Sequence, residues 1–129
     1  MRPQATRHVP STDVAASIVP MFESIDAGRW SRLGEYFHDE VVYVRPGYAP
    51  ITGIGDLLDF YRNRRIIKSG RHVIESICSS AGGDTWVVTG SFTGVDRCGN
   101  GLRARFCDVY SVEAGKIRRR ETFFDSPAV

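Results

Sequence analysis

The segment Arg105–Asp125 places one carboxyl group among aromatic side chains. It reads as two β-strands joined by a tight turn at residues 114–115. Side chains alternate between the two faces of a strand, so Phe106, Asp108 and Tyr110 share a face. A carboxyl group in such surroundings can hold or move a proton, or it can be a structural group that accepts hydrogen bonds from backbone amides or an arginine. The pattern leaves both roles open for Asp108.

The spacing of apolar residues changes once along the chain, from a helical period to strict alternation. Helices are predicted at residues 11–27, 29–37 and 54–68, and strands at residues 41–45, 71–80, 85–95, 103–112 and 116–125. The first helix is expected to bend or break at Pro20, because proline lacks the amide hydrogen that a helix interior uses. Gly70 is expected to close the third helix.

Helices followed by a run of sequential strands are typical of the α+β class, in which helices pack on one face of a mostly antiparallel sheet. The predicted order is α-α-β-α-β-β-β-β. With 129 residues the chain has the size of one domain. Residues 1–10 are polar and flanked by prolines, so we expect a flexible tail there and a single domain over residues 11–129.

The composition is that of an ordinary globular protein, with 42% hydrophobic and 25% charged residues. The net charge of +2 is too small to indicate nucleic-acid binding, and the run "KIRRR" alternates between strand faces instead of forming one patch. Three cysteines without CxxC spacing indicate neither a disulfide framework nor a zinc site. We therefore expect no metal site. No apolar stretch suits a signal peptide or a membrane span, so we expect a cytoplasmic protein.

Four strings, in this order, resemble the SnoaL-like polyketide cyclase and ketosteroid isomerase superfamily, which has the nuclear-transport-factor-two fold. They are "IDAGRW", "YFHDEVVYVRPG", "TGIGDLLDFYR" and "FCDVYSVEAGKIRRRETFFD". The resemblance covers residues 13–125. It implies a cone-shaped roll in which three N-terminal helices and a curved sheet surround a pocket that is open at one end.

The resemblance also assigns roles to single residues. Asp108 matches the protonated aspartic acid that donates a hydrogen bond to the oxyanion in ketosteroid isomerases. Tyr61 matches a tyrosine that supports the isomerase site. The place of the proton-shuttling aspartate holds Arg45, and the place of the oxyanion tyrosine holds Met21. Ordinary ketosteroid isomerisation is therefore disfavoured.

Two other reactions of this superfamily are disfavoured for the same kind of reason. The limonene epoxide hydrolase set of aspartate, arginine and aspartate is replaced by Gly90, Phe92 and Thr122. Scytalone dehydratase-like chemistry uses two pocket histidines, whereas this chain has only His72 on a predicted strand.

The remaining polar and aromatic groups predict a small-molecule pocket. We expect Asp108 as the acid, base or oxyanion partner, assisted by His72, Tyr43 and Arg45. The residues expected to bind substrate are Tyr61, Trp86, Phe92, Phe106, Tyr110, Thr122 and Phe124. The predicted function is a cofactor-independent cyclase or isomerase that acts on a small hydrophobic, oxygenated metabolite, such as a polyketide- or terpenoid-like intermediate. The alternative is a non-catalytic protein that binds a metabolite in the same pocket.

The outer sheet face is predicted to carry Arg103, Arg105, Arg119 and Glu121. It is either a solvated surface or a polar interface between two copies of the chain. Homodimers across this face are frequent among the proteins that the sequence resembles, so we expect a homodimer.

Overall fold

The structure is a computed structural model, and it describes the backbone of residues 9–126 and the side chains of residues 17–126. Its elements are α1 (Val9–Asp26), the 3-10 helix η2 (Trp30–Glu35), β1 (Phe37–Val44), β2 (Ile51–Thr52), α2 (Ile54–Asp59), the π-helical turn η3 (Phe60–Arg64), β3 (Ile67–Ser79), β4 (Thr85–Asp96), β5 (Gly101–Glu113) and β6 (Lys116–Phe124). The tail predicted for residues 1–10 lies outside the described residues, except for Val9 and Pro10, which begin α1.

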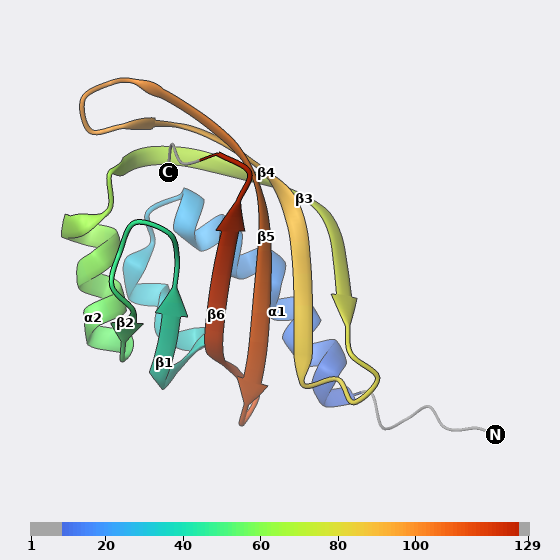
Figure 1. Ribbon diagram of the computed structural model, residues 1–129. Helices are drawn as coiled ribbons and strands as arrows, with labels where there is room; N and C mark the ends of the chain where they lie inside the picture. Colours follow the sequence, from blue (N-terminus) through green and yellow to red (C-terminus); the bar gives the residue numbers. More distant parts are fainter. Residues whose placement is uncertain (1–8, 127–129) are drawn as a thin grey trace.

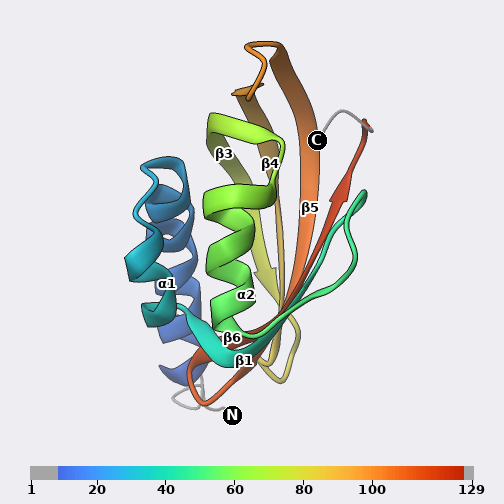
Figure 2. The ribbon, with the colours of Figure 1, turned by 90° about the vertical axis from the view of Figure 1, so that its left-hand side faces the viewer.

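The strands form one six-stranded sheet in the order β2-β1-β6-β5-β4-β3. All neighbouring strands are antiparallel except β1 and β6, which are parallel. Figures 1 and 2 show that the sheet is curved and that α1 and α2 lie on the same side of it. The predicted α+β class with helices on one sheet face is confirmed, and the strand β2 is an addition to the predicted order.

The core lies between α1 and the inner face of the sheet. Ile18, Met21, Phe22 and Ile25 repeat at three and four residues, which places them on one face of α1, and each is at most 2% exposed. They pack in one cluster with apolar side chains from the sheet and from α2. This stripe continues on both sides of Pro20.

The first helix is not broken at Pro20, contrary to the prediction. α1 runs through the proline as one helix of 18 residues. Pro20 removes one backbone hydrogen bond. Burial of the apolar residues before and after it holds the two halves of the helix together, and this contribution outweighs the lost bond.

The third helix is shorter than predicted. It ends at Arg64 after the π-helical turn η3, and Arg65 is already extended with φ −69° and ψ 148°. Ile67 pairs with Asp96 of β4, so Lys68 and Gly70 belong to β3. Ile66 and Ile67 fit the helical period as well as a strand, which is why the spacing alone extended the helix too far. The second predicted helix is a single 3-10 segment.

Two glycines allow β3 and β4 to lie close to the inner side chains where the sheet bends. A Cβ atom at Gly90 would overlap the carbonyl oxygen of Val73 and meet the ring of Phe106. A Cβ atom at Gly94 would overlap the carbonyl oxygen of Ser69. Side chains at these positions would push the two strands apart and open the curvature that encloses the space under the sheet.

Candidate functional site

A small cavity lies between the helices and the inner face of the sheet. Its lining residues are Ile25, Tyr43, Arg45, Tyr61, Arg65, Ile67, His72, Phe92, Phe106, Asp108, Arg120, Thr122 and Phe124. The side chains leave about 20 Å³ for the centre of a water-sized molecule. That volume is of the order needed to hold a single water molecule. The lining combines aromatic rings with six other polar or charged groups, which come from β3, β5, β6 and the segments that directly follow β1 and η3.

Asp108 is fully buried and accepts hydrogen bonds from three residues. Tyr110 donates its hydroxyl to Oδ2 at 2.7 Å, and Thr122 donates its hydroxyl to Oδ1 at 2.6 Å. Arg120 donates from Nε at 3.1 Å and from Nη2 at 2.9 Å, both to Oδ2. These donors match an ionised carboxylate, which accepts hydrogen bonds and donates none. Of the two roles considered for Asp108, the geometry fits the structural one, in which an ionised carboxylate accepts hydrogen bonds.

The ion pair of Asp108 with Arg120 is also buried, with side-chain exposures of 0% and 4%. Burial has the largest single effect and lowers the pKa of Arg120, but the Asp108 carboxylate and the neighbouring tyrosines together outweigh it and raise that pKa well above its usual range. Arg45 was the arginine that the sequence suggested as a neighbour of Asp108. The structure pairs Asp108 with Arg120 instead.

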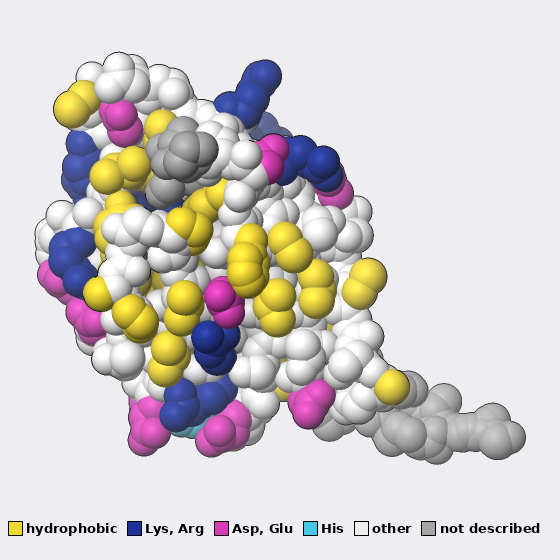
Figure 3. Space-filling view, in the orientation of Figure 1, with side chains coloured by type: hydrophobic (Ala, Val, Ile, Leu, Met, Phe, Trp, Pro, Cys, Tyr) yellow, Lys and Arg dark blue, Asp and Glu magenta, His cyan; other side chains and the backbone are white. Residues whose placement is uncertain are grey.

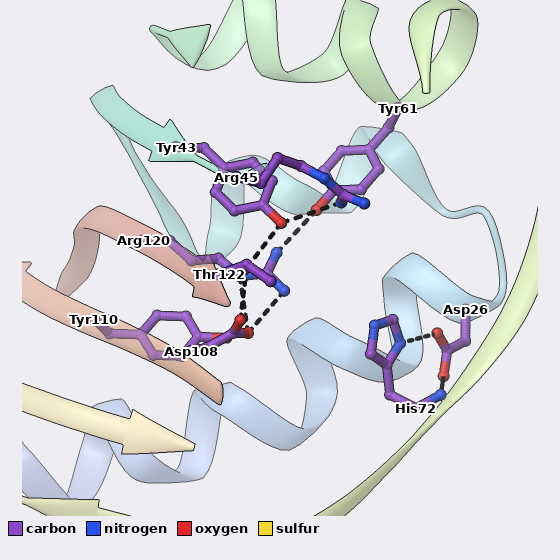
Figure 4. Close-up of polar contacts among 9 residues, drawn as sticks. All are labelled: Asp26, Tyr43, Arg45, Tyr61, His72, Asp108, Tyr110, Arg120 and Thr122. Atoms are coloured by element: carbon purple, nitrogen blue, oxygen red, sulfur yellow. Dashed lines mark hydrogen bonds and ion pairs between the residues drawn. The ribbon is translucent and has the colours of Figure 1, made fainter. Parts of the chain in front are cut away.

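Tyr43 and Arg45 extend this network toward the end of β1. The Thr122 hydroxyl hydrogen points to Asp108, so Thr122 accepts the hydrogen bond of 2.9 Å from the Tyr43 hydroxyl. Arg45 donates from Nη1 to the Tyr43 hydroxyl at 3.2 Å. The result is a chain of donors from Arg45 through Tyr43 and Thr122 to the carboxylate of Asp108, which Figure 4 shows.

The network also includes two more tyrosines, Tyr61 and Tyr110. The Tyr61 hydroxyl accepts a hydrogen bond of 2.9 Å from Nη1 of Arg120. Burial raises the pKa of Tyr61, and it raises the pKa of Tyr110 well above its ordinary value. Both hydroxyls therefore stay protonated near neutral pH, and that of Tyr110 donates to Asp108.

His72 forms a separate pair with Asp26 at the end of α1, on the other side of the same cavity (Figure 4). Its Nδ1 lies 2.6 Å from Oδ1 of Asp26, and its backbone amide donates to Oδ2 at 2.9 Å. The rings of Phe22, Phe92 and Phe106 surround the imidazole, with centroid separations of 4.7 to 5.4 Å. Burial lowers the pKa of His72, and the Asp26 carboxylate only partly opposes this.

This environment defines the protonation of the imidazole. A neutral His72 donates its Nδ1–H to the carboxylate of Asp26, which leaves the lone pair on Nε2. A histidine oriented by a carboxylate in this way is a common general base. Of all the groups that line the cavity, His72 is the one best suited to accept a proton.

The chain matches a family model described as "SnoaL-like domain" over residues 18–120, which is most of its length. The chain belongs to the SnoaL-like domain family. No curated protein matches its sequence.

Solved structures share the fold of this SnoaL-like chain at low sequence identity. An NTF2-like protein of Burkholderia pseudomallei superposes with a TM-score of 0.78 and 16% identity, covering 88% of this chain and 91% of the other. A protein described as a SnoaL-like polyketide cyclase from Jannaschia sp. CCS1 gives 0.76 and 15%, with 97% and 92% covered. An LEH-like epoxide hydrolase of M. tuberculosis gives 0.76 and 16%, with 88% and 79% covered. At these identities the similarity concerns the fold.

The SnoaL-like cavity brings together most of the residues predicted for the site. These are Tyr43, Arg45, Tyr61, His72, Phe92, Phe106, Asp108, Thr122 and Phe124. Trp86 and Tyr110 are not among the lining residues. Trp86, near the start of β4, donates its indole N–H to the carbonyl of Gly83. Tyr110 donates its hydroxyl to Asp108.

Sequence reasoning missed three charged residues of the SnoaL-like site, Arg65, Arg120 and Asp26. Arg120 was detectable, since it shares its strand face with Thr122, two residues further on. Arg65 was assigned to the interior of a helix, and only the π-helical turn directs it inward. Asp26 reaches His72 across 46 residues of sequence, and no local pattern signals that contact.

Among the described residues, no group of three or more histidine, cysteine, aspartate or glutamate side chains is arranged to hold a metal ion. No helix in the described part of the chain is long and apolar enough to cross a membrane.

Proposed function

We propose that this protein is a cofactor-independent acid–base enzyme acting on a small hydrophobic, oxygenated metabolite, as a cyclase or isomerase in natural-product biosynthesis. The observation that carries the proposal is the pairing of His72 with Asp26 on the same cavity as the arginine and tyrosine donors. A base and a set of oxygen-binding donors around one space are the two parts that enolisation of a carbonyl compound requires.

In the proposed reaction, His72 Nε2 takes a proton from a carbon next to the substrate carbonyl. The electron pair of the broken C–H bond forms a C=C bond, and the carbonyl electrons move onto oxygen. Asp26 stabilises the imidazolium that forms, as the orienting carboxylate does in related dyads. Return of the proton to another carbon gives isomerisation. Attack of the enolate carbon on a second carbonyl carbon closes a ring, and the imidazolium then gives its proton to the alkoxide that forms on the second carbonyl oxygen.

The enolate oxygen is stabilised by donors on the opposite wall, where Arg45 and Tyr61 line the cavity. Asp108 has a positioning role in this mechanism, because its oxygens already accept four hydrogen bonds. This differs from the expected role of Asp108 as acid, base or oxyanion donor. The carboxylate fixes Arg120 and Thr122, and through Thr122 it fixes Tyr43.

Substrate entry requires side chains to move, since the cavity holds little more than one water molecule. Phe124 is half-buried near the end of β6, and the guanidinium of Arg45 lies 5.3 Å from its ring centroid. Both side chains lie near strand ends, where rotation disturbs the sheet least. We infer that rotation of the Phe124 and Arg45 side chains opens the cavity to the substrate.

The proposal is tested by deuterium exchange, followed by NMR, at the carbon next to the carbonyl of 1-phenylpropan-2-one and of phenylpyruvate. The wild-type protein is expected to accelerate exchange of at least one compound. His72→Gln is expected to lower that rate by about 100-fold or more, the usual contribution of a positioned general base. His38→Gln is the matched control, because His38 contacts Glu113 away from the cavity. Equal rates in the wild type and His72→Gln would contradict the mechanism.

The second candidate is a non-catalytic protein that binds a metabolite. The saturated, buried ion pair of Asp108 and Arg120 favours it, since neither partner is poised to exchange a proton. A binding protein gives no exchange above background in either variant, while ligand affinity survives His72→Gln.

A further inference from the structure

More arginine than carboxylate side chains line the cavity. Three arginines line it, Arg45, Arg65 and Arg120, against one carboxylate, Asp108. Asp108 is occupied by Arg120 at 2.9 Å. The three guanidinium groups are buried, with residue exposures of 6%, 4% and 3%. Removing positive charge from water in this way is costly unless an anion compensates it.

Arg65 carries a buried charge that no carboxylate of the described residues compensates. No carboxylate in the described part of the chain lies within ion-pair distance of it, and its Nε is buried without a hydrogen-bond partner there. Burial lowers the pKa of Arg65, as expected for a cation without a neighbouring anion.

The position of Arg65 is fixed by its neighbours. Its backbone amide closes the π-helical turn on the carbonyl of Phe60, and its own carbonyl accepts a hydrogen bond of 2.8 Å from Arg97. Its guanidinium lies 5.2 Å from the ring centroids of both Trp30 and Tyr61. Packing against aromatic rings restrains a guanidinium while its N–H groups remain directed outward in its own plane.

Tyr61 supplies a second donor beside Arg65. Its hydroxyl oxygen accepts from Nη1 of Arg120, so its hydrogen is available for an acceptor elsewhere. Both Tyr61 and Arg65 line the cavity. Two donors from neighbouring side chains, one of them cationic, suit a negatively charged oxygen better than a neutral carbonyl.

We propose that the cavity recognises an anionic oxygen of its ligand, a carboxylate or an ionised enol, through Nε–H of Arg65 and the hydroxyl of Tyr61. This deepens the proposed function by naming the charge of the substrate. It also holds for a protein that binds without catalysis.

The test compares binding of benzoate with binding of its neutral isostere benzamide, by isothermal titration calorimetry in chloride-free buffer at constant ionic strength. The wild type is expected to bind benzoate at least about tenfold more tightly than benzamide. Arg65→Met retains an apolar side chain of similar length and is expected to bind the two probes equally. Arg62→Met is the matched control, since it removes the same charge from an exposed position in the same turn and retains the preference.

The fold of Arg65→Met is checked by thermal unfolding. Its Tm is expected to equal or exceed that of the wild type, because the variant removes a buried charge that has no carboxylate partner. A structural role for Arg65 would instead lower the Tm.

Tyr61→Phe gives a second, independent test. It keeps the ring and removes the hydroxyl, and the preference for benzoate is expected to fall by about threefold, the effect of one hydrogen bond. Equal affinity of the wild type for both probes, or an unchanged preference in Arg65→Met or in Tyr61→Phe, would overturn the proposal. Titration requires no turnover, so a protein that binds benzoate but catalyses no exchange separates failure of the mechanism from failure of this inference.

Discussion

Asp108 and Arg120 depend on each other because each is buried with a full charge. A buried ion pair contributes little compared with an apolar pair of the same size, but loss of one partner leaves an uncompensated charge in the core. Asp108→Asn is therefore expected to lower the free energy of unfolding by about 3 kcal/mol or more, measured by urea denaturation. Asp108→Asn combined with Arg120→Met is expected to recover most of the loss.

The matched control for Asp108→Asn is Asp39→Asn, an identical change at an exposed position of β1. The control is expected to change the free energy of unfolding by at most about 0.5 kcal/mol. A loss below about 1 kcal/mol in Asp108→Asn would contradict the charged state that we assign to this carboxylate.

The face of each strand residue was largely predictable. Strict alternation placed Phe106, Asp108 and Tyr110 on the inner face, and the structure confirms that all three are buried. The role of Asp108 was not predictable, because it depends on which arginine lies beside it. That neighbour comes from the adjacent strand, and its distance is set by the strand register that pairs Asp108 with Thr122.

At the scale of elements, the errors lie where local patterns permit two structures. The spacing of Ile66 and Ile67 fits a helix as well as a strand, and the β4–β5 hairpin decides between them. Arg97 in that hairpin donates to the carbonyls of Arg62 and Arg65, and its amide donates to Ile66, which fixes the end of the helix. No sequence window includes both partners of these contacts.

The parallel pairing of β1 with β6 is another feature beyond local prediction. Phe37 lies opposite Ile117, 80 residues further along the chain, and the register then shifts before Val42. Residues 38–40 are polar, so the sequence placed the start of this strand at Val41. Pairing with β6, rather than strand propensity, extends β1 back to Phe37.

At the scale of the whole molecule, the outer sheet face is less polar than the sequence suggested. Figure 3 shows hydrophobic side chains gathered over β3, β4 and β5 on this face. Val73 and Phe123 are 51% and 45% exposed. Val87 and Val109, which pair across β4 and β5, are half-buried beside them. An apolar group of this kind suits contact with a second sheet better than contact with water.

We expect the protein to form a homodimer through this face. Analytical ultracentrifugation at micromolar concentration is expected to give the mass of two chains, and Phe123→Glu is expected to give one, because it would bury charge in the interface. Val19→Glu is the control, since Val19 is a 42% exposed apolar residue on α1, away from this face. A wild-type monomer at these concentrations would exclude the dimer.

The central claim is that His72 is a neutral imidazole with its proton on Nδ1 and its lone pair on Nε2. Since burial lowers the pKa of His72 in the folded protein, the unfolded chain takes up this proton first as the pH falls. Stability is therefore expected to decrease as the pH drops below the ordinary histidine value of about 6.5, and the base is expected to remain active at mildly acidic pH.

The most direct test is ¹⁵N NMR of the histidine side chains across pH, with His72 assigned by comparison with His72→Gln. The account predicts that, at pH 7, His72 has a protonated Nδ1 and an unprotonated Nε2, and that its titration midpoint lies below about 6.5. An imidazolium at pH 7, or a neutral ring with the proton on Nε2, would contradict the assignment of His72 as the base.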